Sequence, residues 1–179
     1  MKPSVLVITP VVPTGAIDVE STLEPFRGSG VSITNVFLDE GPSSIETDSD
    51  VIACLPGVMR AARLSAAAAR AVVVNCMCDP GVPELRQALT VPVFGAAQTS
   101  MHVAASLGTR FSVIDVLPEG RDYVERQVEK FGLQGSFASH RALGIPVLDL
   151  FRDTERTLAA MEREARGALK DGADALVLG

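Results

Sequence analysis

Short apolar runs along the chain alternate with longer stretches of helical period. The apolar runs are nearly continuous in Val, Ile and Leu, and they do not alternate apolar with polar residues. Such runs are typical of strands covered on both faces, as in a parallel sheet with helices on each side. Strands are predicted at Val5–Thr9, Val31–Leu38, Ala71–Asn75, Pro92–Phe94, Arg110–Val116, Gly135–His140 and Ala173–Leu178.

Stretches with a helical period separate these runs, and the alternation favours a doubly wound α/β architecture. One of them contains Pro56-Gly57, which we expect to kink or interrupt the helix. The last is the most regular, and its apolar positions fall on one face, at Leu158, Met161, Ala165 and Leu169. Helices are predicted at about Ala16–Pro25, Ser49–Arg70, Pro83–Leu89, Thr99–Leu107, Glu119–Phe131 and Thr154–Lys170.

Two stretches of the chain are similar in kind. Ala71–Asn75 and Ala173–Gly179 both read as buried apolar strands with an Ala-containing lead-in, and each follows a long Ala-rich helix. We therefore expect two related α/β halves, residues 1–95 and residues 96–179. Because a strand without a following helix is an unusual end for such a chain, we also expect the natural protein to continue past Gly179.

Composition and charge narrow the class of protein. The chain has 179 residues, 47% of them hydrophobic and 21% charged, as in a globular protein of one or two domains. Its 16 basic and 22 acidic residues give a net charge of −6 without a cluster of Lys or Arg, so nucleic acid and anionic membranes are not expected partners. Unbroken apolar runs are far shorter than the ~20 residues that span a bilayer, and the N-terminus does not resemble a secretory signal. Three cysteines are too few for a disulfide scaffold, so we expect a soluble, cytoplasmic protein with reduced thiols.

The sharpest candidate for chemistry is Cys76, which directly follows a predicted buried strand. Ligands of open α/β sheets bind at the carboxyl ends of the strands, next to helix N-termini, and a cysteine there has its thiolate favoured. The alternative is that Cys76 is one more small buried residue, as free cysteines usually are. Cys54 lies inside an apolar helical stretch, and we expect it in the core. A redox or metal pair of Cys76 with Cys78 is disfavoured, because its disulfide ring would be strained and no further ligand lies near in sequence.

The histidines and glycine-rich segments add no second chemistry. His102 lies on a predicted helix and His140 ends a predicted strand, and neither has a sequence neighbour that suggests a catalytic triad. Gly28-Ser29-Gly30 precedes a strand instead of following one, which disfavours a nicotinamide, flavin or ATP site. We therefore expect an activity that needs neither cofactor nor metal.

Two segments combine into a fairly specific pattern. Cys76–Gly81 has the form Cys-x-x-Asp-Pro-Gly, and Gly41–Glu46 has the form Gly-Pro-x-Ser-Ile-Glu. Further stretches that fit the same pattern, in order and spacing over essentially the whole chain, are Val5–Pro10, Val91–Gly95, Arg110–Ile114, Ala138–Arg141 and Ile145–Leu150. Together they resemble the hydantoin racemase branch of the aspartate/glutamate racemase superfamily.

This resemblance implies two flavodoxin-like halves with parallel sheets covered by helices, and an active site in the cleft between them. It also implies racemisation without a cofactor by two cysteines, of which Cys76 matches the first. The second would directly follow the strand that ends at Gly179. The chain departs from the family where Thr9-Pro10-Val11 replaces the usual Asn-Pro-Asn, and where Gln98 stands in place of a common glutamate.

We therefore expect a racemase of a 5-substituted hydantoin or allantoin. Inversion of such a carbon needs a base on one face of the planar carbanion and an acid on the other. The N–H groups of the Cys76–Gly81 turn would stabilise the enolate. Besides the catalytic Cys76, substrate-binding residues are expected at Thr9, Val11, Ile45, Asn75, Met77, Cys78, Gln98 and Asp115.

Two alternatives remain open at this point. One is a decarboxylase similar to arylmalonate decarboxylase, or a related cysteine isomerase, in which a cysteine protonates an enediolate. The other is a non-catalytic module that binds a small anion. The expected partners are a small-molecule substrate and further copies of the chain in a homo-oligomer.

Overall fold

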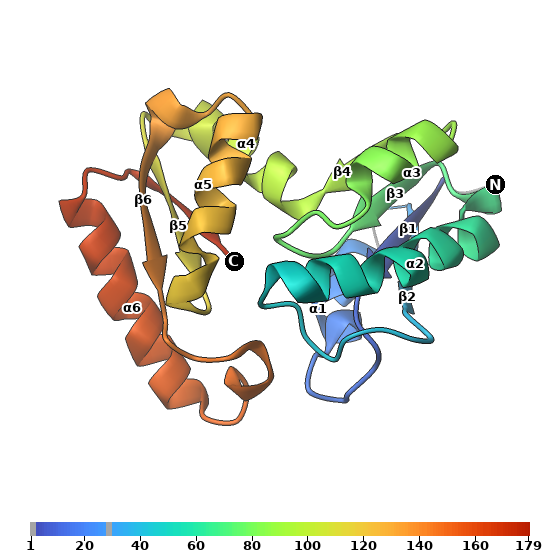
Figure 1. The fold of residues 1–179 in the computed structure, drawn as a ribbon, viewed down its shortest axis with the longest axis horizontal. Coiled ribbons are helices and arrows are strands. Elements are labelled where there is room, and N and C mark those ends of the chain that lie inside the picture. The colour runs from blue at the N-terminus through green and yellow to red at the C-terminus, as the bar shows by residue number, and fades with distance from the viewer. Residues whose placement is uncertain (1–2, 28–29) are drawn as a thin grey trace. The chain divides into compact units, whose positions relative to one another are not determined.

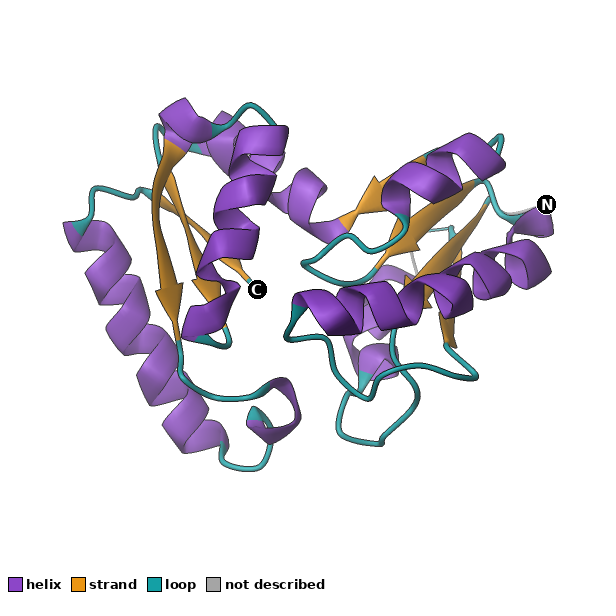
Figure 2. Cartoon of the chain, viewed as in Figure 1, coloured by secondary structure: helices purple, strands orange, loops and turns teal. Residues whose placement is uncertain are grey.

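The computed structural model describes residues 3–27 and 30–179, so Gly28-Ser29 of the glycine-rich segment lies outside the described residues. The strands of the described chain pair in parallel, and helices connect them (Figures 1 and 2). The strands are β1 (Ser4–Thr9), β2 (Ser32–Phe37), β3 (Ala71–Val74), β4 (Val93–Gly95), β5 (Phe111–Asp115), β6 (Phe137–Ala142) and β7 (Ala175–Leu178). The α-helices are α1 (Val19–Arg27), α2 (Asp48–Ser65), α3 (Val82–Ala88), α4 (Ala96–Leu107), α5 (Arg121–Lys130) and α6 (Thr154–Lys170).

The strands form two sheets. The four-stranded sheet has the order β2-β1-β3-β4, and the three-stranded sheet has the order β6-β5-β7. Both follow the flavodoxin-like order 2-1-3-4-5 from its beginning. The predicted α/β fold, with two parallel sheets covered by helices, is confirmed.

The chain divides into two compact units. Unit 1 consists of Met1–Ile45 and Ser49–Ala96 and carries the four-stranded sheet. Unit 2 consists of Glu46–Asp48 and Ala97–Gly179 and carries the three-stranded sheet. That residues 1–95 and 96–179 are separate domains stays a prediction.

Glu46–Asp48 groups with unit 2 because two of its carboxylates are bound there. The Oε1 atom of Glu46 accepts a hydrogen bond from the backbone N–H of Val147 at 2.9 Å. Asp48 forms an ion pair with Arg126 of α5, also at 2.9 Å. Because Val147 begins a single 3₁₀ turn, Glu46 satisfies an N–H that the turn itself leaves unpaired.

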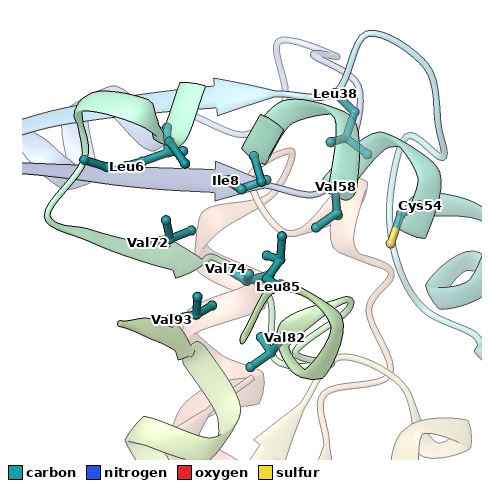
Figure 3. Close-up of a cluster of buried hydrophobic side chains, with 13 residues drawn as sticks. Leu6, Ile8, Leu38, Cys54, Val58, Val72, Val74, Val82, Leu85 and Val93 are labelled. Atoms are coloured by element: carbon teal, nitrogen blue, oxygen red, sulfur yellow. The ribbon is translucent and has the colours of Figure 1, made fainter. Parts of the chain in front are cut away.

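The hydrophobic core of unit 1 lies on one face of its sheet (Figure 3). Helices α2 and α3 pack on this face, α2 through Cys54 and Val58 and α3 through Val82 and Leu85. The strands contribute Leu6, Ile8, Val72, Val74 and Val93. This packing holds the carboxyl ends of β1 and β3 at fixed positions.

Of the kink or interruption predicted at Pro56-Gly57, the interruption does not occur, because α2 runs through this site as one helix. Gly57 allows a neighbouring segment to contact the helix closely and does not break the helix. A Cβ atom there would lie 2.8 Å from Leu38 Cδ1 and 2.9 Å from the backbone oxygen of Glu40. The missing side chain lets the segment that follows β2 pack directly on the helix.

By length and composition alone, Asp48–Ala68 is apolar enough to cross a membrane. One face of this segment packs in the core of unit 1 through Cys54, Val58 and Ala62. Packing inside the unit accounts for only part of its apolar composition, because Ile52 and Leu64 are 67% and 74% exposed.

In unit 2, α5 and α6 cover opposite faces of the sheet (Figure 1). The apolar face predicted for α6 is correct only in part. Met161 and Ala165 pack against the core, but Leu158 and Leu169 are 59% and 61% exposed. The fully buried positions of the helix are the smaller Thr157, Ala160 and Ala168.

The small residues of α6 make room for a charged side chain beneath the helix. A Cβ atom at Gly167 would lie 2.2 Å from Nη1 of Arg141, a residue of β6. The Arg141 guanidinium also pairs with Glu164 at 3.2 Å and with Asp171 at 2.9 Å. The helical period of the sequence does not encode this ion-pair cluster, which lies against the helix at Gly167.

The two sheets repeat the same register between their first two strands. In unit 1, Val7 of β1 pairs with Asn35 of β2. In unit 2, Val113 of β5 pairs with His140 of β6. Asn35 of unit 1 therefore corresponds to His140 of unit 2. At the ends of the central strands, Thr9 of unit 1 corresponds to Asp115 of unit 2.

The register on the other side of each central strand repeats as well. The N–H of Asn75, directly after β3, donates to the oxygen of Ile8 at 2.8 Å. The N–H of Gly179, directly after β7, donates to the oxygen of Ile114 at 2.8 Å. Asn75 and Gly179 are thus equivalent positions in the two units.

Candidate active site

Cys76 lies at the carboxyl edge of the unit 1 sheet, one residue beyond the hydrogen-bonded ladder. Its side chain is half-buried, and its Sγ atom accepts a hydrogen bond from the backbone N–H of Cys78 at 3.4 Å. A backbone N–H that donates to sulfur stabilises a thiolate more than a thiol. The edge itself is where ligands bind in open α/β sheets.

The turn after Cys76 is fixed by an aspartate and two glycines. Asp79 donates its N–H to the oxygen of Cys76 at 3.0 Å, and its φ angle of 48° lies in the left-handed region, as does the φ of 74° at Gly81. A Cβ atom at Gly95, the last residue of β4, would lie 2.3 Å from the Asp79 carboxyl group. The turn therefore rests against the neighbouring strand, and only glycine fits there. The sequence predicted the turn itself, because Asp-Pro-Gly is a recognisable turn signal, but not the approach of Asp79 to Gly95.

Cys54 lies in the core, as predicted. Its side chain is 0% exposed, and its Sγ atom donates to the oxygen of Val51 at 3.2 Å. Burial, and secondly the negative charge at Cys76, raise the pKa of the Cys54 thiol to about 12. All three cysteines are free, and in residues 3–27 and 30–179 no three His, Cys, Asp or Glu side chains gather as a metal ion would require.

Thr9 connects three strands beside Cys76. Its buried hydroxyl donates to Oδ1 of Asn35 at 2.8 Å, and it accepts a long hydrogen bond of 3.5 Å from Nδ2 of Asn75. The amide of the residue that precedes Cys76 is thereby held relative to the central strand. Asn35 belongs to this network but was not singled out from the sequence, because it lies within β2 and not at its end.

The other predicted binding residues of unit 1 differ in how accessible they are. Met77 and Cys78 are half-buried in the turn after Cys76. Val11 is buried; its N–H donates to the oxygen of Thr9, and its own oxygen accepts from Leu38. Ile45 is half-buried and packs against the hydrophobic core. That these side chains bind substrate stays a prediction.

Gln98 and Asp115, also predicted to bind substrate, belong to unit 2. Gln98 lies in the first turn of α4, and its backbone oxygen is 2.7 Å from Nδ1 of His102. The His102 ring in turn lies 6.0 Å from the ring of Phe131. His102 is therefore a local structural residue of α4, in line with the sequence reading that it has no triad partner.

Asp115 ends β5, and the structure pairs it with His140. Nε2 of His140 lies 3.3 Å from Oδ2 of Asp115. The sequence offered no partner for His140, because the two residues are 25 positions apart and meet only through the register of β5 and β6. At the equivalent place, unit 1 has the neutral pair of Thr9 and Asn35.

The family model of the Asp/Glu/hydantoin racemases matches residues 18–179. The chain belongs to this family. Members with similar sequences include the hydantoin racemase of Pseudomonas sp. strain NS671, 32% identical over 163 residues, which are 90% of this chain and 66% of that protein. The hydantoin racemase of Rhizobium meliloti is 35% identical over 140 residues, 77% of this chain and 58% of that racemase. The chain thus spans about three fifths to two thirds of the length of these two racemases.

A solved racemase structure has the same fold. The allantoin racemase from Klebsiella pneumoniae superposes with a TM-score of 0.89 at 29% sequence identity. The superposition covers 99% of this chain and 74% of that racemase. The resemblance read from the sequence is confirmed at the level of the family and of the fold.

Proposed function

We propose that this racemase-family protein inverts C5 of a 5-substituted hydantoin or of allantoin, without a cofactor, by proton transfer between two thiols. Cys76 is the first thiol. The observation that carries the proposal is the position of its sulfur, at the carboxyl edge of the unit 1 sheet and next to the N–H of Cys78. The named racemases with similar sequences and the allantoin racemase fold support the same reaction class.

The chemistry suits the residues around Cys76. The thiolate takes the proton from C5, the C–H electron pair moves into the ring carbonyl, and a planar enolate forms. A second thiol then gives its proton to the opposite face and becomes the thiolate. In this scheme a backbone N–H group at the carboxyl edge of the sheet stabilises the enolate oxygen.

The second thiol has a counterpart position in unit 2. Asn75 and Gly179 make equivalent hydrogen bonds to the central strands of their sheets. In the two-cysteine scheme the second thiol belongs at the position that corresponds to Cys76, directly after Gly179.

The proposal also covers the residues that contact the substrate and the cellular compartment of the protein. The substrate-binding residues are Thr9, Val11, Ile45, Asn75, Met77, Cys78, Gln98 and Asp115. The three free cysteines favour the reducing cytoplasm as the compartment. A homo-oligomer is part of the same proposal and is checked by light scattering.

The decisive experiment follows optical rotation and solvent deuterium together. Each pure enantiomer of a 5-alkyl hydantoin is incubated in D₂O with the wild type, with Cys76→Ser and with Cys54→Ala, and the uncatalysed reaction is subtracted. Cys76→Ser should lower racemisation of both enantiomers by at least about a hundredfold, because each direction needs an acid or a base at Cys76, and should lower deuterium incorporation most for the enantiomer whose C5 proton faces Cys76. Cys54→Ala removes a buried thiol outside the site and should retain the racemisation rate. Racemisation that survives in Cys76→Ser contradicts the proposal.

A further inference from the structure

The carboxylate of Asp115 is held firmly but keeps capacity for further hydrogen bonds. Its Oδ1 accepts from the backbone N–H of Val116 at 2.7 Å, and its Oδ2 faces Nε2 of His140 at 3.3 Å. A carboxylate only accepts hydrogen bonds and has about four lone-pair sites, so the ring must donate and two sites remain. The Asp115 side chain is 20% exposed and that of His140 is 1% exposed. The open part of the pair is therefore the carboxylate.

Two glycines leave space around this carboxylate. A Cβ atom at Gly120 would lie 2.0 Å from Oδ2 of Asp115, and one at Gly179 would lie 3.3 Å from Oδ1. Any other residue at Gly120 would displace the acid. The carboxylate thus occupies a cradle lined by backbone at the carboxyl edge of the unit 2 sheet, where such sheets bind ligands.

The Arg121 guanidinium next to the pair is bound to other groups. Arg121 of α5 donates through Nη2 to the backbone oxygen of His140 at 3.2 Å and pairs with Glu125 at 3.6 Å. The Arg121 guanidinium is thereby engaged with the strand backbone and with its own helix. Unit 1 has Thr9 and Asn35 at the equivalent places, so only the edge of unit 2 carries an acid at the end of its central strand.

We propose that Asp115 accepts a ring N–H of a neutral cyclic amide and so selects substrates with an unsubstituted ring nitrogen, and that His140 is its positioning residue. The inference rests on the proposed function, because it assigns one substrate contact of that reaction. A hydantoin ring carries two N–H donors that a carboxylate can accept. A hydrogen bond to a carboxylate is about twice as strong as one between neutral groups.

The test measures binding by calorimetry with three probes that share one side chain. The probes are 5-benzyl hydantoin, its N1-methylated form and its N3-methylated form. For the wild type, methylation of one of the two ring nitrogens should weaken binding at least about tenfold. In Asp115→Asn this difference should shrink to about threefold or less, since the neutral amide does not provide a charged acceptor.

Asp122→Asn is the matched control, since it makes the same change at an exposed carboxylate in the first turn of α5. It should retain the preference of the wild type for the unmethylated ring. If Asp115→Asn also retains this preference, or if the wild type does not show it, the inference is overturned.

His140 is tested by two replacements. His140→Leu removes the donor and should reduce the preference for the unmethylated ring, while His140→Gln, whose amide can still donate to Asp115, should restore most of it. A merely structural role would lower the melting temperature of both variants and leave the preference unchanged, which would overturn the positioning role.

Racemisation measured on the same samples separates the two proposals. A wild type that shows the Asp115-dependent preference but does not exchange the C5 proton contradicts the proposed function and leaves this inference standing. If the wild type racemises and Asp115→Asn keeps the wild-type preference, the proposed function stands and this inference is overturned.

Discussion

At the scale of single residues, the same side chain has different chemistry at different places in unit 1. Cys54 and Cys76 are both free thiols, but one lies in the core between α2 and the sheet and the other at the sheet edge beside a backbone N–H. Burial raises the pKa of Cys54 to about 12, so that thiol stays protonated and unreactive near neutral pH. Position relative to the sheet separates a structural cysteine from a candidate catalyst.

Alkylation by iodoacetamide should show this difference directly. A thiol with a pKa of about 12 is ionised to roughly one part in 10⁴ at pH 8, so Cys54 should label only when the protein unfolds. Cys76, half-exposed at the sheet edge, should label in the folded protein. Peptide mass mapping between pH 6 and pH 10 distinguishes the sites, including Cys78. Labelling of Cys54 before Cys76 would show that the thiols are assigned the wrong way round.

At the scale of elements, close contacts override sequence signals that are usually reliable. Pro56-Gly57 is a common break signal, but α2 continues through it, and Leu38 and the backbone of Glu40 pack closely on the helix at Gly57. The candidate site at Cys76, directly after β3, depends on this packing, because α2 packs on the face of the sheet that carries the core residues of β3.

Gly57→Ala should therefore destabilise the protein, although alanine is the better helix former. The new methyl group would meet a flexible leucine side chain and also the backbone oxygen of Glu40, which has little freedom to move. We expect a loss of about 1–3 kcal/mol in the free energy of unfolding, as for other overpacked sites. Urea unfolding measures it. Gly135→Ala, where a Cβ atom has nothing within 4 Å, is the control and should change stability by less than about 0.5 kcal/mol.

At the scale of the whole molecule, acid should weaken the fold through unit 2. Backbone N–H groups of Thr109 and Arg110 hold the pKa of Asp174 below its ordinary value of 3.8. The Arg141 guanidinium, followed by Ser139, does the same for Asp171. A depressed folded-state pKa contributes stability that is present above the unfolded pKa and is lost as pH falls through the folded pKa.

The melting temperature should thus be nearly constant from pH 7 to about pH 4.5 and should fall below about pH 4. Asp174→Asn should be less stable at pH 7, because its NH₂ group cannot accept both backbone N–H groups, and its fall in acid should be shallower. Differential scanning calorimetry from pH 3 to pH 7 measures both effects. An acid transition of unchanged steepness in Asp174→Asn contradicts the assignment.

The pattern of the sequence alone determined the α/β class, the parallel sheets, the position of Cys76 at a strand end and the place of Cys54 in the core. These features depend on residues close together in the chain, because burial on both faces makes a strand uniformly apolar and a strand end is a local event. Only the tertiary structure decided the buried face of α6, the close approach at Gly57 and the pairing of Asp115 with His140. Each of these depends on which distant segment lies alongside, as when the register of β5 and β6 brings a histidine onto an aspartate 25 residues away.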